Sequence, residues 1–168
     1  MYTRLAVLLL AAAIPRSIAH AEMCQNAYPE GDWPCAFVAN TVQNAPTAKV
    51  FARNAAPIID TKEKHEFRTM IRQIAKQPAN FAGHYVAGDW GCGTGCTQWA
   101  IIDTRSGKVL PILRVEAPFP IPDDFSYAKF SLDSPVIVFH GSMTDNGYDG
   151  LHYFKMENGK LMPIQGPK

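Results

Sequence analysis

The sequence lacks an excess of charge of either sign. Among its 168 residues, 16 are Lys or Arg and 15 are Asp or Glu, and charged residues make up only 18% of the chain. Proteins that bind nucleic acid or anionic membrane surfaces need basic patches, which gain from counterion release or from attraction to lipid. The composition therefore argues against a nucleic-acid partner. A hydrophobic fraction of 47% argues in turn against a disordered chain.

An apolar run long enough to span a membrane is also missing. The stretch Leu5–Ile14 has ten residues, about half of the roughly twenty that a membrane-spanning helix needs. A basic start at Met1–Arg4, a break at Pro15 and an Ala-His-Ala ending at Ala21 are typical of a cleaved export signal. We therefore expect residues 1–21 to be a signal peptide, and the mature protein to be periplasmic or secreted, without a membrane span.

Repeats and linkers are absent as well. Removal of residues 1–21 leaves 147 of the 168 residues; it also removes Arg4 and Arg16 but no acidic residue, so 14 basic residues face 15 acidic ones, a net charge of −1. This length suits one domain with its own core. We expect an irregular, disulfide-stapled lead-in over 22–48 and a single α+β domain over 49–168, present as a monomer.

Cysteines are few, and they come as two close pairs, Cys24 with Cys35 and Cys92 with Cys96. Four cysteines allow three disulfide connectivities. We favour the two local pairings, because each pair lies in a loop that contains Gly or Pro and exported proteins meet an oxidising compartment. A four-cysteine zinc site, which tolerates the spacing of Cys92 and Cys96, is the alternative.

Hydrophobic periodicity predicts one amphipathic helix over about 60–77. Asp60 and Glu63 form a capping pattern at its start, and Pro78 follows its end. Its core-facing stripe consists of Phe67, Met70, Ile71 and Ile74.

The chain after Phe81 changes to short β-type runs separated by turn residues. The predicted strands are 81–87, 97–103, 108–113, 127–131, 136–140, 151–156 and 160–164. Asp103–Gly107 predicts a hairpin with a left-handed glycine, and Glu157–Lys160 predicts a type I′ hairpin. The expected fold is α+β, an antiparallel β meander with one helix packed on it, stapled by disulfides.

Catalytic and cofactor motifs are missing. The sequence has no G-x-S-x-G or H-E-x-x-H, and GCGTGC lacks the Lys-Ser/Thr end of a phosphate-binding loop. We therefore predict no cofactor and no catalytic residue. Two alternatives stay open: a small exported enzyme, either a hydrolase or a thiol oxidoreductase, in which Cys92 is activated by His84, and a metal-binding protein. The metal ligands would be His84, His140 and His152, which fall in predicted strands.

One segment of about thirty residues carries the motifs N-F-x-G-x-Y, W-G-C-G-T-x-C and I-I-D-x-x-x-G-K-V, between Asn80 and Val109. It resembles a family of small exported bacterial proteins with no assigned function. Its organisation, a strand leading into a cysteine-bounded loop and then an apolar strand, is similar in outline to the Ivy-type periplasmic lysozyme inhibitors. Those loops carry a His and an Asp where this chain has Gly93-Thr94-Gly95, so the resemblance implies loop presentation and not that target.

The loop from Trp90 to Cys96 is therefore the predicted binding site. A short disulfide would hold its glycine-rich centre in one shape, and an aromatic residue beside a rigid turn can anchor a partner. We expect an exported binding module, such as an inhibitor, whose ligand is a protein or a component of the cell envelope. The predicted contact residues are Trp90, Gly93, Thr94 and Gly95.

Overall fold

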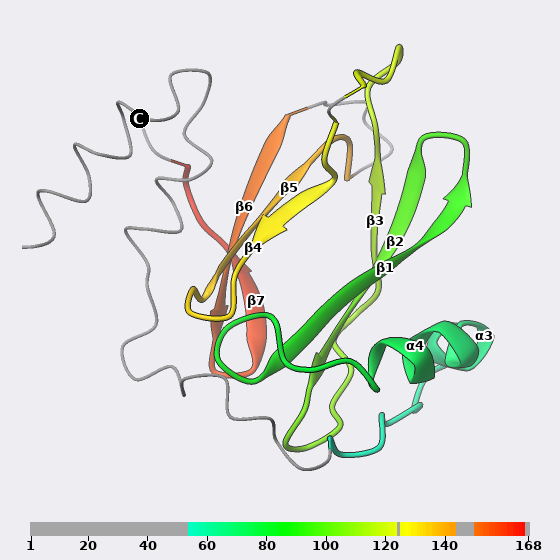
Figure 1. Cartoon of the computed structure of the whole chain (residues 1–168), viewed down its shortest axis with the longest axis vertical. Helices are drawn as coiled ribbons and strands as arrows, with labels where there is room; N and C mark the ends of the chain where they lie inside the picture. Colours follow the sequence, from blue (N-terminus) through cyan, green and yellow to red (C-terminus); the bar gives the residue numbers. More distant parts are fainter. Residues whose placement is uncertain (1–53, 124, 144–149, 167–168) are drawn as a thin grey trace, which may run out of the picture.

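The structure, a computed structural model, describes residues 54–123, 125–143 and 150–166. This part of the chain forms two short helices followed by seven strands in two antiparallel sheets (Figure 1). The expected α+β class is confirmed, although the strands divide between two sheets and do not make one meander. The signal peptide, the lead-in over 22–48 and the expected disulfide between Cys24 and Cys35 lie outside the described residues.

Two helices replace the single helix expected over 60–77: α3 (Lys62–Glu66) and α4 (Arg68–Ile74). They are separated by Phe67, whose φ of −96° and ψ of 15° depart from helical geometry. The predicted stripe is nevertheless confirmed, because Ile71 and Ile74 are buried and Phe67 and Met70 pack beside them. No helix in the described ranges has the length and apolar character to cross a membrane.

The helix cap differs from the prediction. Thr61 is the N-cap residue, and its hydroxyl oxygen accepts a hydrogen bond from the backbone N–H of Lys64 at 3.2 Å. The carboxylate of Asp60 instead accepts a bond from the ammonium of Lys64 at 2.7 Å. The Asp60 carboxylate, which was predicted to cap the helix, therefore forms an ion pair with Lys64, four residues later.

The first sheet has the strand order β1-β2-β3, with β1 (Tyr85–Gly93), β2 (Cys96–Asp103) and β3 (Leu113–Glu116). The second has the order β4-β5-β6-β7, with β4 (Ala128–Phe130), β5 (Val136–His140), β6 (Leu151–Glu157) and β7 (Lys160–Pro163). Every neighbouring pair is antiparallel.

The strand expected over 81–87 is wrong in its boundaries. Phe81 forms only an isolated bridge with Tyr85, because Ala82 and Gly83 have positive φ and turn the chain between them. Strand β1 begins at Tyr85 and continues six residues beyond the expected end, through Gly93. The glycine-rich segment predicted as a loop is thus mostly strand.

The strand expected over 108–113 is also displaced. It contributes a single bridge, between Val109 and Ile102, and β3 begins only at Leu113. Pro111 lies between the two, and proline has no backbone N–H to donate to a ladder.

Both predicted turns have the required glycine geometry. Gly107 has φ 76°, and its N–H donates to the carbonyl of Asp103 at 2.8 Å. Asn158 and Gly159, with φ of 51° and 70°, have the two positive values of a type I′ turn. The predicted hairpin chemistry is confirmed at both positions.

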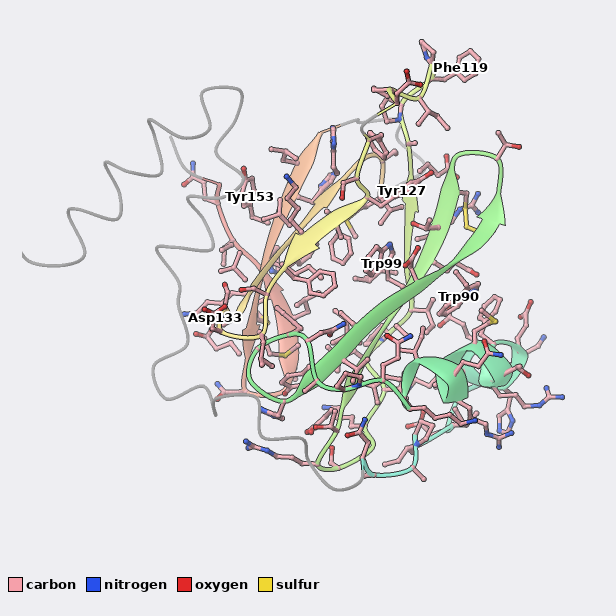
Figure 2. The ribbon with its side chains drawn as sticks, in the orientation of Figure 1. Trp90, Trp99, Phe119, Tyr127, Asp133 and Tyr153 are labelled. Carbon is pink, nitrogen blue, oxygen red and sulfur yellow. A yellow bond between two sulfur atoms is a disulfide. The ribbon has the colours of Figure 1, made fainter. Side chains whose placement is uncertain are left out.

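Packing of the two sheets against each other forms the larger core. Trp99 of β2 lies edge-on against Phe130 of β4 and Phe139 of β5, with ring centroids 6.0 and 5.5 Å apart (Figure 2). The sheets are also joined by backbone hydrogen bonds between Glu116 and Ser142, of 2.9 and 2.8 Å. This junction fixes the end of β3 and hence the start of the loop that follows it.

Candidate functional site

The predicted disulfide between Cys92 and Cys96 is confirmed. It closes the turn between β1 and β2, where Gly93 pairs with Cys96 in the strand register. A disulfide leaves no thiolate to bind zinc, so the four-cysteine zinc site is not supported. His84 precedes the start of β1 while Cys92 lies near its end, and this separation does not support a paired nucleophile and base.

Trp90 does not lie exposed beside the turn as predicted. Its side chain is 8% exposed and packs against Phe67, with ring centroids 5.2 Å apart (Figure 2). The indole N–H donates to Oε1 of Gln98 at 2.8 Å. Alternation along β1 puts Trp90 on the same face as Val86, where the helices cover the sheet. The structure therefore does not support Trp90 as an anchor for a partner, because little of its side chain is accessible.

The other predicted contact residues do lie at the hairpin turn. Gly93 and Thr94 are exposed, and Gly95 is half-buried. Gly93 and Gly95 have φ of 137° and 70°, which explains why glycine occupies these positions. The carbonyl of Gly95 accepts a hydrogen bond from the N–H of Ala117 at 2.7 Å, so the turn is tied to the loop that follows β3.

That loop carries the most exposed large apolar side chain among the described residues. Phe119 is 93% exposed and projects away from both sheets (Figure 2), and Ile121 is 41% exposed. The chain around them, Ala-Pro-Phe-Pro-Ile-Pro over 117–122, restricts the backbone at three prolines. We call Gly93, Thr94, Gly95, Phe119 and Ile121 the tip surface.

Sequence reasoning missed Phe119 and Ile121. Alternation of proline with apolar residues was the available signal, because it marks an extended loop that cannot bury its side chains in a ladder. A single exposed apolar residue is ordinary in a protein surface. Here two lie within three positions of one loop: Ile121 is next to the disulfide-closed turn, since a Cβ on Gly95 would lie 3.3 Å from its Cδ1, and Phe119 is almost fully exposed.

His84 and Asp103 form a titratable pair in which both pKa values are lowered. His84 Nε2 lies 3.8 Å from Asp103 Oδ1. Burial lowers the pKa of His84, Arg105 lowers it further, and Asp103 opposes both. Desolvation raises the pKa of Asp103, but hydrogen bonds from the Arg105 backbone and from Ser106, with the charge of His84, outweigh it and lower the pKa.

This pair does not have the geometry of a hydrolase. The Ser106 hydroxyl donates to Asp103 at 2.9 Å and not to His84, whereas a serine nucleophile needs a hydrogen bond to its base. The Asp103 carboxylate also accepts the Arg105 N–H at 2.9 Å and so organises its own turn. The arrangement supports a structural role.

The three histidines predicted to lie in strands are not brought together, and His84 lies just before β1. Gly83 donates to the carbonyl of Leu132, which places His84 near the start of β5, whereas His140 lies at the end of β5. His152 Nε2 is 2.8 Å from the carbonyl oxygen of Gly141. Within the described ranges, no three His, Cys, Asp or Glu side chains are grouped as metal ligands.

His84 should make the protein less stable in acid. Its lowered pKa means that the unfolded chain binds the proton more readily, so stability is lost as the pH falls below about 6.5. His84→Gln should therefore flatten the acid side of the profile in urea unfolding between pH 5 and 8. His65→Gln, which replaces an exposed histidine of α3, is the control. A steeper acid loss in His84→Gln than in the wild type would contradict this account.

The site thus consists of a disulfide-closed hairpin turn joined to a proline-rich loop. Its side chains are apolar or small, and none of them is a nucleophile paired with a base. Comparison of the chain with protein-family models, with curated proteins and with solved structures gave no match.

Proposed function

We propose that the protein is an exported binding module that presents the tip surface to a protein or to another component of the cell envelope. The observation that carries this proposal is the 93% exposure of Phe119 in the loop that is hydrogen-bonded to the disulfide-closed turn. The sequence of residues 1–21 supports export. A rigid apolar tip suits binding, while catalysis needs converging titratable groups.

Preorganisation supports the same role. The disulfide restrains one half of the tip surface, and the prolines at 118, 120 and 122 restrain the other. The hydrogen bond from Ala117 to Gly95 holds the two halves together. A surface held in one shape loses less entropy when it binds, so more of the contact energy appears as affinity.

Phe119→Ala should weaken partner binding about 30-fold, the effect of losing a 2 kcal/mol anchor. The side chain has almost no contacts to lose, so the free energy of unfolding should stay within about half a kcal/mol of the wild type. Mature protein immobilised on a surface would be exposed to envelope extract. The partner retained would be identified by mass spectrometry, purified and titrated against both proteins.

Met162→Ala is the matched control. Met162 is a large apolar residue 44% exposed on β7, in the other sheet, and its loss should leave the affinity unchanged. A retained partner that binds Phe119→Ala as tightly as the wild type would contradict the proposed function.

A further inference from the structure

Along the outer edge of β1, the backbone groups of the first half have hydrogen-bond partners elsewhere in the described chain, whereas those of the second half do not. β1 is an edge strand, paired only with β2 among the described strands. The N–H of Thr104 donates to the carbonyl of His84 at 3.0 Å. Hydrogen bonding alternates along an antiparallel strand, so even-numbered residues from His84 to Trp90 bond to β2. The N–H and C=O groups of the odd-numbered residues from Tyr85 to Gly91 point outward.

The first half of this edge is filled by the preceding chain. Tyr85 N–H donates to the carbonyl of Phe81 at 2.8 Å, and the Tyr85 carbonyl accepts from Phe81 at 3.0 Å. At Ala87 the partner is a side chain: Asn80 Oδ1 accepts from the N–H at 2.8 Å, and Asn80 Nδ2 donates to the carbonyl at 2.9 Å. The Asn80 amide therefore does what a residue of a neighbouring strand would do.

The second half has no such occupant. In the part of the chain that the structure describes, no other residue bonds the outward backbone groups of Asp89 and Gly91. Burial raises the pKa of the Asp89 carboxyl, and a hydrogen bond from its own backbone N–H partly offsets that rise. A side-chain carbon at Gly91 would meet nothing within 4 Å. Edges are normally blocked by proline, lysine or a bulge, and here the bulge comes only after Gly91.

We propose that the partner adds an extended polypeptide segment to β1 beside Asp89 and Gly91. This inference rests on the proposed function, and it names the partner as a protein with an exposed extended segment. The occupant is a main chain because an amide already fills the preceding position at Ala87, and only a polypeptide continues that pattern at strand spacing. Asp89 forms no ion pair with a described cation, which favours a basic residue in the segment.

Hydrogen exchange of the mature protein tests the open edge without a ligand. The Ala87 amide should be protected in the wild type and should lose protection in Asn80→Ala. The Gly91 amide, which has no acceptor among the described residues, should exchange freely in the monomer. Protection of the Gly91 amide in a monomer at low concentration would overturn the proposal, because the edge would then already be filled.

A phage-displayed random dodecapeptide library provides the probe. Peptides selected on the mature protein should lose binding when every second residue is N-methylated and should keep it when the residues between are. This scan modifies only the peptide, so the protein stays wild type. Gly91→Pro should weaken them at least tenfold, since an outward N–H is where an edge strand tolerates proline. The proposal would be overturned if N-methylation lowered the peptide affinity equally at every position, or if no selected peptide bound the wild type more tightly than Gly91→Pro.

The two proposals fail differently. If Phe119→Ala weakens the envelope partner and Gly91→Pro does not, strand addition is wrong and the binding module stands. If neither variant changes its affinity, both are wrong. A concentration-dependent dimer that Gly91→Pro abolishes would make a second copy the occupant and overturn the peptide segment.

Discussion

Trp90→Ala should lower the free energy of unfolding by roughly 3 to 5 kcal/mol, the usual loss for truncating a buried aromatic residue. Trp90 is 8% exposed, packs on Phe67 and donates to Gln98. The substitution would open a cavity between β1 and the helices. Guanidinium unfolding followed by circular dichroism measures the loss.

Trp90→Phe separates packing from hydrogen bonding at this position. It keeps an aromatic ring against Phe67 but leaves Oε1 of Gln98 without its donor, so it should lose less stability than Trp90→Ala. If the free energy of unfolding of Trp90→Ala instead lies within about half a kcal/mol of the wild-type value, the side chain is not buried in solution. Trp90 would then return as a candidate anchor of the tip surface.

The burial of Trp90 illustrates where sequence reasoning stopped. The segment Gly88–Gly93 contains three glycines and an aspartate, residues that are depleted in strands, and the sequence therefore predicts a loop. Its strand conformation comes from pairing with the apolar β2, whose residues 99–102 are buried. Strand formation depends on such neighbours more than on local preference. Once β1 includes position 90, alternation puts its side chain under the helices.

Local features were more predictable than pairing. The stripe at Ile71 and Ile74, the left-handed Gly107 and the type I′ turn at Asn158 and Gly159 each depend on residues within a few positions. Division into two sheets depends instead on contacts between distant segments, such as that of Glu116 with Ser142. Periodicity identifies strands but not their partners.

The tip surface depends both on local features and on contacts between segments that are distant in the sequence. The disulfide between Cys92 and Cys96 follows from local spacing and the expected export. The neighbouring loop is held against it by the hydrogen bond from Ala117 to Gly95, which joins the turn between β1 and β2 to the loop after β3 and leaves no sequence pattern. The exposure of Phe119 likewise depends on where β3 ends.

Gly141→Ala should destabilise the protein by roughly 3 kcal/mol or more. Gly141 has φ 133°, and a Cβ there would lie 2.2 Å from the carbonyl oxygen of Glu116. The strained backbone contributes roughly 1 to 3 kcal/mol, and forcing atoms into a packed site adds a similar amount. The obstacle is backbone and not a flexible side chain, so the hydrogen bonds between Glu116 and Ser142 would have to break.

Gly93→Ala is the matched control for this prediction. Its φ of 137° is nearly the same, but a Cβ there would meet nothing within 4 Å. The two substitutions therefore share the backbone strain of a positive φ, but only Gly141→Ala brings a Cβ close to the carbonyl oxygen of Glu116. Urea unfolding of both variants, with hydrogen exchange at Glu116 and Ser142, should show the larger loss and the faster exchange in Gly141→Ala. Equal losses would mean that the sheets do not meet this closely at Gly141, and that the end of β3 is held by other contacts.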